Sequence, residues 1–443
     1  MNIKQLMVSI LCLSIIFSFS GCGSEKKKES KLETDYQTSY TSNTTSWRNV
    51  QTDENGQYVN FSGFLYCYNE KNNTFAPVCE KVNCLHDKDP DKLKQIECNA
   101  NIGHHTIVGD DNQSVWNDCG MIQYYEGYIY YVQGNRVYRL KKDGSKTDCV
   151  LKLKESISIS FFLIHRGYLY YEMETNYTRG QEVYGNIQIY KLEIADHMNE
   201  KDAECLLDLK DTNQDFLGFG GFNASGDYVT YEYQVRDKTE KMEEDDWWKT
   251  KSYDPTILYN IKTGKKEEIT FPKKDQTPGV GIQTVLFLDK YYLVKLYDNT
   301  KDVDEKMPTY LVDYKTGKWH LWKDTLPQGT VLLTYKDYII ENNVDRAYHK
   351  KKKYADYTIY SLEGKKVANY KCPIKGEADH EGFGPDGIQI LQEHKGHKYN
   401  VYEVKFQDVL KLHGEKITPK RIGTMGDNTE MYDVMLPDEY WNK

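Results

Sequence analysis

The feature that most constrains the fold is a short segment that recurs along the chain. Each copy places an aromatic or apolar anchor in an extended stretch, and most copies continue through a turn into a second extended stretch. Lys-Thr-Gly and Lys-Asp-Gly turns favour hairpins, because Gly and Asp tolerate positive φ. The aligned anchors are Tyr66, Tyr138, Tyr190, Tyr259, Val312, Tyr360 and Tyr402. With 38 Tyr against 14 Phe, the composition suits half-buried, pleated surfaces.

The last six copies each have a further strand-like stretch upstream. One unit shows the pattern in full, with extended stretches at Tyr128–Val132, Arg136–Leu140 and Cys149–Leu153 separated by Gly134-Asn135 and Asp143-Gly144. This arrangement predicts an antiparallel meander. Its strands carry apolar groups on both faces, as expected where sheets pack on sheets.

Meanders that recur roughly every 40–70 residues predict an all-β, seven-bladed β-propeller over residues 51–443. Six or eight blades, an open solenoid and two sandwiches are the alternatives. The first copy shows no upstream partner, so we expect C-terminal strands at Arg421–Met425 and Met431–Leu436 to complete its blade. N- and C-terminal strands would then close the ring and remove exposed edges.

The N-terminus predicts export. Lys4 precedes a 14-residue apolar stretch, Leu6–Phe19, which is shorter than the roughly 20 residues of a membrane span and fits a signal peptide. Phe19-Ser20-Gly21-Cys22 resembles the bacterial lipobox, although Phe19 stands where Leu is usual. The resemblance implies that residues 1–21 are removed and that Cys22 receives a lipid such as palmitate; an uncleaved N-terminal anchor is the alternative.

The next stretch predicts a flexible tether. Residues 22–50 are rich in Ser, Thr, Lys and Glu, with few aliphatic side chains to offset ordering entropy. We therefore expect a lipid-anchored protein on the extracytoplasmic side of the cell membrane. The formal net charge of −9 argues against nucleic acid as a partner, since that interaction needs a basic face.

Cysteines concentrate in a predicted interblade insertion at residues 79–122. The spacing is Cys79-x4-Cys84-x-His86-x11-Cys98, followed by Cys119. Because this segment is so polar, it cannot build an adequate hydrophobic core, and we expect a covalent cross-link or a bound metal to stabilise it. Disulfides suit an exported protein, whereas Cys79, Cys84, His86 and Cys98 would form a Cys3His structural zinc site. Both interpretations stay open, as do free thiols.

The lipobox, the Cys-x-His…Cys-Asn-Ala segment and the YIYY and LYR-L-DG repeats together resemble a group of clostridial-type β-propeller lipoproteins. The resemblance covers most of the chain. It implies a surface lipoprotein with a propeller fold and supplies no ligand.

The long loops predict which face of the disc binds ligands. Residues 172–187, 234–256, 298–308 and 344–356, together with the crossover at 79–122, all map to one face of a propeller. Loops on a rigid scaffold commonly carry binding sites. We also expect the crossover at 79–122 to cap or border the central funnel. Trp247 and Trp248 are candidates to contact a sugar ring or peptide, with packing beneath their loop as the alternative.

No Gly-x-Ser-x-Gly, His-Glu-x-x-His or phosphate-loop motif is present, so the sequence names no catalytic residue. We therefore expect a binding platform for an extracellular glycan, peptide or partner protein. A carbohydrate-active enzyme with carboxylates in a central funnel is the first alternative. A scaffold for envelope assembly is the second.

Overall fold

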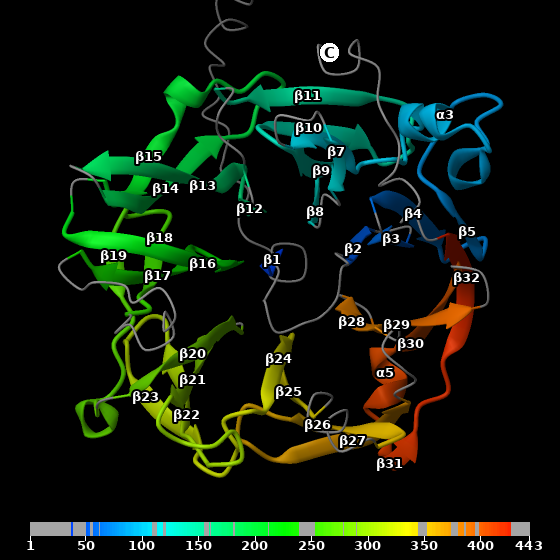
Figure 1. The fold of residues 1–443 in the computed structure, drawn as a ribbon. Helices are drawn as coiled ribbons and strands as arrows, with labels where there is room; N and C mark the ends of the chain where they lie inside the picture. The colour runs from blue at the N-terminus through cyan, green and yellow to red at the C-terminus, as the bar shows by residue number, and fades with distance from the viewer. Residues whose placement is uncertain are drawn as a thin grey trace, which may run out of the picture.

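The computed structural model describes residues 37–38, 50–53, 56–61, 63–108, 113–117, 121–154, 159, 161–179, 182–210, 212–238, 253–277, 279–288, 290–343, 352–373, 380–384, 387–394 and 398–426. Antiparallel sheets stand around a central axis, with their first strands innermost (Figure 1). The chain is therefore a β-propeller.

The first half of the described chain builds sheets whose strands follow one another outward from the axis. They are β2 (Val50–Asp53), β3 (Gly56–Phe61), β4 (Phe64–Asn69) and β5 (Thr74–Pro77); β8 (Ile122–Tyr125), β9 (Tyr128–Gln133), β10 (Arg136–Lys141) and β11 (Thr147–Lys152); β12 (Phe162–His165), β13 (Tyr168–Arg179), β14 (Glu182–Glu193) and β15 (Glu204–Asp208); and β16 (Gln214–Ser225), β17 (Tyr228–Asp237), β18 (Thr256–Asn260) and β19 (Lys266–Glu268).

The second half continues the same order. Its sheets are β20 (Val280–Phe287), β21 (Tyr291–Asp298), β22 (Thr309–Asp313) and β23 (Trp319–Lys323); β24 (Val331–Tyr335), β25 (Tyr338–Asn342), β26 (Tyr354–Tyr360) and β27 (Lys366–Pro373), with β31 (His413–Lys416) parallel to β27; and β28 (His380–Gly384), β29 (Gly387–His394), β30 (Lys398–Lys405) and β32 (Lys420–Gly426).

Short elements lie between or beside the sheets. They are the hairpin β6 (His104–Val108) and β7 (Gln113–Asn117), the helices α3 (Lys92–Glu97) and α5 (Phe406–Val409), and the 3₁₀ helices η1 (His86–Lys88), η2 (Glu200–Asp202) and η4 (Lys273–Asp275). None of the helices in the described part of the chain has the length and hydropathy of a bilayer-spanning segment.

The repeated anchors occupy equivalent positions, which confirms the repeat. Each anchor lies in the third strand of a different sheet. At Tyr138, Tyr190, Tyr360 and Tyr402 the pairing with the fourth strand shifts register beside the anchor. The recurring sequence position therefore corresponds to a recurring bulge, which increases local twist.

The core lies between neighbouring sheets rather than within one centre. Tyr170 of β13 and Tyr231 of β17 are almost fully buried and belong to one apolar cluster that joins two sheets. Leu258 of β18 and Val294 of β21 are also buried, and they belong to the apolar cluster that joins the β16–β19 and β20–β23 sheets. Each sheet thus needs both neighbours to bury its two faces.

The prediction that C-terminal strands complete the first sheet is wrong for the described residues. β4 pairs with β3, which pairs with β2, and β32 pairs with β30 in its own sheet. A tight turn between Phe61 and Phe64 makes the β3–β4 hairpin, and Gly63 there adopts a φ of 74°. Met431–Leu436 lie outside the described residues.

The ring closes through side chains where β28–β32 meets β2–β5 (Figure 1). One apolar cluster joins Tyr66 of β4 to Ile422 and Met425 of β32. The Gln57 amide donates to Glu403 at 2.5 Å. The Lys420 ammonium donates to the Tyr68 hydroxyl at 2.9 Å, and Lys405 pairs with Glu70.

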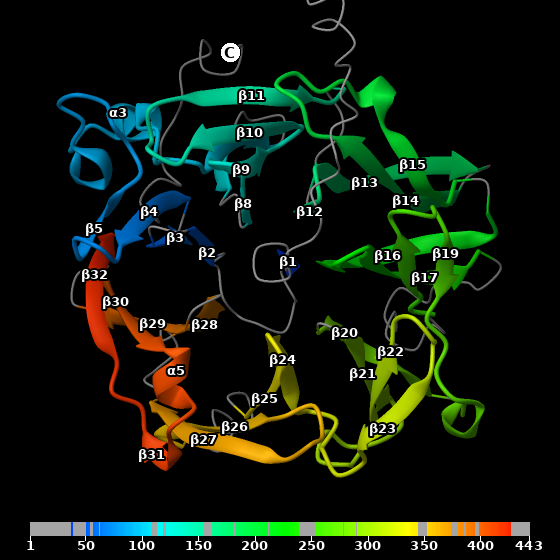
Figure 2. The ribbon, with the colours of Figure 1, turned by 180° about the vertical axis from the view of Figure 1, so that it is seen from behind.

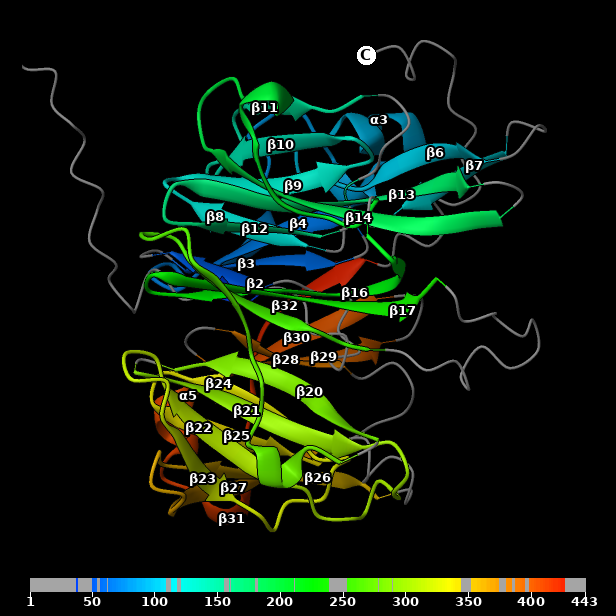
Figure 3. The ribbon, with the colours of Figure 1, turned by 90° about the vertical axis from the view of Figure 1, so that its left-hand side faces the viewer.

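One segment that was predicted to be a loop, and one that was predicted to be a flexible tether, contain β-strands. Residues 172–187, expected as a loop, are mostly β13 and β14, because alternating side chains extend this hairpin and Tyr177 stacks on Tyr184 across it. The hairpin projects from the same side of the disc as β6–β7 (Figure 3). Within the predicted tether, Gln37–Thr38 form β1, which pairs with β16 inside the ring (Figures 1 and 2).

Gly423 should be sensitive to substitution, because β32 passes close to β5 at the closing joint. A Cβ atom at Gly423 would lie 2.8 Å from Cβ of Phe75. We expect Gly423→Ala to lower the free energy of unfolding by about 1–3 kcal/mol through overpacking. Chemical unfolding measures this. At Gly218 an added Cβ meets nothing within 4 Å, so Gly218→Ala is the matched control. Equal stability of the two variants would contradict this account of the joint.

Candidate metal centre and candidate binding pocket

The cysteine-rich insertion lies at the rim of the disc, not at the central funnel. β5 is the outermost strand of its sheet, so the chain that follows Pro77 starts at the periphery, and α3 lies at the outer edge of the ring (Figure 1). For residues 79–98, the expectation that the crossover borders the funnel is therefore wrong; the crossover continues through β6 and β7 to β8, the innermost strand of the next sheet.

The structure brings four of the predicted site residues together. One ligand atom each from Cys79, Cys84, His86 and Cys98 lies within 4.8 Å of the other three. Nδ1 of His86 is 3.4 Å from Sγ of Cys98. Cys98 is buried and the other three are half-buried. Within the described part of the chain, no disulfide joins the three cysteines. The cluster can hold a metal ion.

Local turns and caps position the cluster. His86 opens η1 with a φ of 57°, a left-handed conformation that is uncommon outside Gly and Asn. Asp91 caps α3 by accepting a hydrogen bond from the Leu93 amide at 3.1 Å. The buried Gln95 amide donates to the Asp89 carbonyl at 2.6 Å and thereby ties α3 to the preceding loop. Cys98 follows directly as the C-terminal cap of α3.

The cluster's protonation preferences differ among its members. Burial raises the pKa of the Cys98 thiol well above its usual range. Partial burial acts to raise the pKa of Cys79 too, but hydrogen bonds from the backbone of Lys81 and Asn99 outweigh it and lower that pKa. Burial lowers the pKa of His86, which favours the neutral imidazole that binds metals.

Of the other cysteine and histidine side chains of the insertion, the structure describes nothing. Cys119 lies outside the described residues. His104 and His105 belong to β6, and of their side chains nothing is described. Trp247 and Trp248 also lie outside the described residues, so their role stays a prediction.

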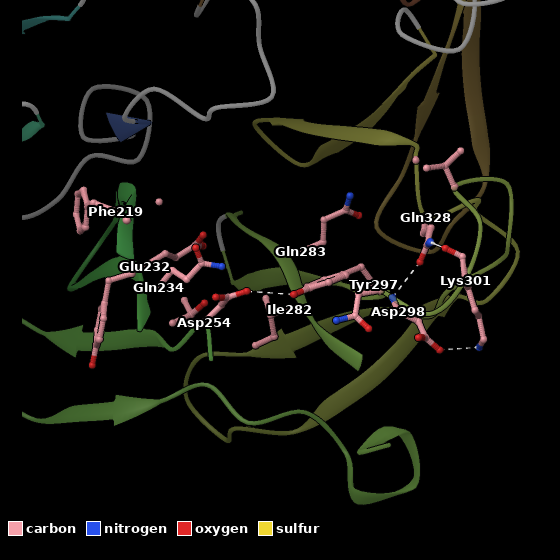
Figure 4. A pocket seen from close by; sticks show the side chains of 17 residues that line it. Phe219, Glu232, Gln234, Asp254, Ile282, Gln283, Tyr297, Asp298, Lys301 and Gln328 are labelled. Atoms are coloured by element: carbon pink, nitrogen blue, oxygen red, sulfur yellow. Dashed lines mark hydrogen bonds and ion pairs between the residues drawn. The ribbon is translucent and has the colours of Figure 1, made fainter. Parts of the chain in front are cut away.

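A second candidate site is a cavity of about 540 Å³ between the β16–β19 and β20–β23 sheets (Figure 4). Asp254 comes from the loop before β18, and Lys301 and Val303 come from the loop after β21. Two of the loops predicted to carry binding, 234–256 and 298–308, thus line one cavity. Gln328 and Gly329 of the crossover to β24 close its far end.

The cavity presents oxygen atoms without partners. The Tyr297 hydroxyl donates to Oδ2 of Asp254 at 3.1 Å. Oδ1 of Asp254 and Oε1 of Gln283 are buried and have no hydrogen-bond partner among the described residues. Burial, with a smaller contribution from Asp254, raises the pKa of Glu232 to about 7. Leaving buried acceptors unmatched costs about 1–3 kcal/mol each, so a ligand with donors would stabilise the site.

Irregular strands create this cavity. The register of β20 with β21 shifts between Ile282 and Thr284, which leaves Gln283 as the unpaired residue of a bulge. β16 carries two further shifts, one of them around Gly220. A Cβ atom at Gly220 would lie 3.1 Å from Oε2 of Glu232, so a glycine there makes room for the carboxylate. Bulges commonly re-aim side chains beside functional sites.

Charge is paired at the other end of the cavity. Asp298 accepts from Thr300 and lies 3.1 Å from the Lys301 ammonium, and the hydrogen bond from the Thr300 hydroxyl lowers the pKa of Asp298. Figure 4 shows Glu232 and Asp254 on one side of the cavity, with Tyr297 and Gln283 facing them from the next sheet.

Sequence reasoning missed Glu232, Asp254, Gln283 and Tyr297. The usable signal was the run Gly218-Phe-Gly-Gly221 inside a predicted strand, because glycines within strands mark bulges or close approaches.

No protein-family model matches the chain, and no curated protein matches it. Among solved structures, an oligogalacturonate lyase in complex with manganese is 11% identical, with a TM-score of 0.48 over 86% of this chain and 100% of that chain. An acylaminoacyl peptidase of Pyrococcus horikoshii is 12% identical, with a TM-score of 0.42 over 85% of this chain and 53% of that one.

A prolyl endopeptidase is 11% identical, with a TM-score of 0.43 over 89% of this chain and 49% of that one. This chain spans about half the length of the two peptidases. Likenesses this distant carry no argument about activity.

Glu232 should make stability fall as pH rises through its titration range. Its pKa is raised in the folded state from 4.5 to about 7, so the folded protein binds the proton more tightly than the unfolded chain does. The stabilising contribution of the bound proton is full below pH 4.5 and is lost as pH rises through 7. We expect Glu232→Gln to gain stability relative to wild type across this window, measured by unfolding at several pH values.

Glu193→Gln, an exposed change at the end of β14, is the control. A wild-type minus variant difference that stays constant between pH 4.5 and 7.5 would contradict the assignment to Glu232.

Proposed function

We propose that this chain is a lipid-anchored lipoprotein on the extracytoplasmic side of the membrane, with a seven-bladed propeller that binds an extracellular ligand. Among the described residues, seven sheets of four or five strands stand around the axis, and this supports the proposed blade count. The lipobox-like sequence ending at Cys22 and the polar stretch after it support the anchor and tether.

The observation that carries the binding proposal is the cavity between the β16–β19 and β20–β23 sheets. Its inner surface offers acceptors at Glu232, Asp254 and Gln283. Phe219 adds an aromatic face. A ligand that combines hydroxyl or N–H donors with an apolar face fits this lining, because its donors would match the unpartnered oxygens of Asp254 and Gln283. A glycan meets this description best, followed by a peptide.

The second candidate function is a carbohydrate-active enzyme, and one observation favours it. Glu232 and Asp254 share the cavity, and the pKa of Glu232 near 7 is the value expected of a general acid or base at neutral pH. Most glycosidases use two carboxyl groups in different environments, one as a general acid and the other as a base or nucleophile. The carboxylates lie between two blades rather than at the central axis.

Glycan-array binding tests the cavity. We expect a printed array of bacterial and plant polysaccharide fragments to yield at least one bound structure, with Asp254→Asn and Gln283→Ala each lowering its affinity about tenfold through a lost charge-assisted or neutral hydrogen bond. Glu193→Gln should bind as wild type does. Binding that survives both cavity substitutions unchanged would place the ligand elsewhere.

Product analysis on the same bound glycan separates the two functions. Cleavage that Glu232→Gln abolishes while binding persists would favour the enzyme. Stable binding without products would favour the platform.

Removal of the lipidation site tests the anchor. We expect Cys22→Ala to abolish incorporation of a palmitate analogue and to move the protein out of the membrane fraction, because stable tethering depends on acyl chains. Metabolic labelling and cell fractionation measure both. Cys149→Ala, an exposed cysteine of β11, is the control. Unchanged labelling of the Cys22 variant would contradict lipidation at this residue.

A further inference from the structure

We infer that Cys79, Cys84, His86 and Cys98 bind one zinc ion, and that this ion fastens the joint at which the propeller ring closes. The inference is independent of the ligand that the propeller binds.

The kind and number of side chains favour zinc. Three sulfur atoms and one imidazole nitrogen lie within 4.8 Å of one another, the donor set of a closed tetrahedral Cys3His site. Calcium and magnesium prefer oxygen ligands, which this cluster lacks. Three sulfurs cannot all pair with each other, so one disulfide would leave a thiol and the imidazole of His86 unexplained.

Groups around the ligands hold them in place. The Cys84 amide donates to the Lys81 carbonyl at 3.3 Å, which closes the turn between Cys79 and Cys84, and outer contacts of this kind orient metal ligands. The Tyr66 hydroxyl donates to Asp87 at 3.0 Å, which holds the residue next to His86 against β4. Zn²⁺ would displace the thiol protons to solvent without any change of oxidation state, and three thiolates with one neutral imidazole leave the site with a single negative charge.

One side of the cluster packs on the closing joint. Cys98 and Ala100 belong to the buried apolar cluster that includes Val401 of β30 and Ile422 and Met425 of β32. Cys79 and Cys84 pack against the same cluster. The cysteine ligands thus share one apolar cluster with side chains of both the first and the last sheet of the ring.

The other side reaches the β8–β11 sheet. The Asn99 side chain donates to the Gly144 carbonyl at 2.8 Å, and the Glu80 amide donates to the same carbonyl at 3.3 Å. A Cβ atom at Gly144, where φ is 78°, would lie 2.6 Å from the Cys79 nitrogen, so only glycine allows this contact. The insertion therefore bridges three sheets.

Apart from the hydrogen bonds and the contact with the closing joint described above, the insertion has few apolar side chains to hold it in shape. α3 has six residues, and Val82 and Leu85 are exposed. A segment this short and polar gains its order from a cross-link, and metal-binding free energy becomes folding free energy when the site forms only in the folded chain. Loss of the ion should therefore loosen the strands that the insertion touches.

Metal analysis of the full-length, lipidated chain in detergent is the first test. We expect about one zinc per chain after purification under reducing conditions, with at least a tenfold loss in Cys84→Ser and in His86→Ala. Cys205→Ser, an exposed cysteine of β15, is the matched control and should keep its zinc. Zinc retained by both cluster variants at the wild-type level would overturn the site.

Intact mass under denaturing conditions decides against the disulfide alternative. We expect Cys79, Cys84 and Cys98 to be fully reduced and alkylated only after chelation. A disulfide among them, or reduced thiols that take up no zinc when it is supplied, would overturn the inference.

Hydrogen exchange tests the fastening role separately, on wild-type protein so that misfolding of a variant is no concern. Removal of zinc with a chelator should increase exchange at least tenfold in β5, β32 and the β10–β11 turn, with reversal when zinc is restored. β21 and β22, which share no apolar cluster with the described part of the insertion, should change little. Equal exchange in all these strands with and without zinc would overturn the fastening role.

Discussion

Closure of the ring depends on side chains at one joint. A propeller buries both faces of every sheet only if the last sheet meets the first, yet among the described residues no strand is shared between the two. The β28–β32 and β2–β5 sheets meet through an apolar cluster around Tyr66 and Ile422 and through the Gln57–Glu403 hydrogen bond. All other interfaces of the ring rely on this joint, because an open ring would expose two sheet faces to water.

The proposed zinc site lies beside the contact between the first and last sheets, on which closure of the ring depends. Its ligands are close in sequence, between Cys79 and Cys98, but the three cysteines share an apolar cluster with the first and last sheets, and the Cys79 backbone lies against the turn at Gly144. A metal bound by local ligands can therefore stabilise a contact between residues more than 300 positions apart. The cavity with Glu232 and Asp254 lies in other sheets, so the two sites serve separate purposes.

Much of the architecture was predictable because it repeats. Each anchor, such as Tyr138 or Tyr402, lies in a third strand, since the same hairpin must be built in each sheet. The first sheet was missed because Gly56–Phe61 places the polar Gln57 and Asn60 at positions that the fold buries, which weakens its apolar pattern. The rim position of the cysteines was missed because linear spacing does not record that β5 is outermost.

The sequence by itself determined the repeated third strands, most of their neighbours and turns, and the four potential metal ligands. These features depend on alternation, on glycine at positive φ and on short spacing, all of which are local. Only the tertiary structure decided that Asp254, Gln283 and Tyr297 surround Glu232, and that the cysteines lie at the closing joint. Those relations depend on which bulges and sheet faces meet, and that is set by packing between segments that are distant in sequence.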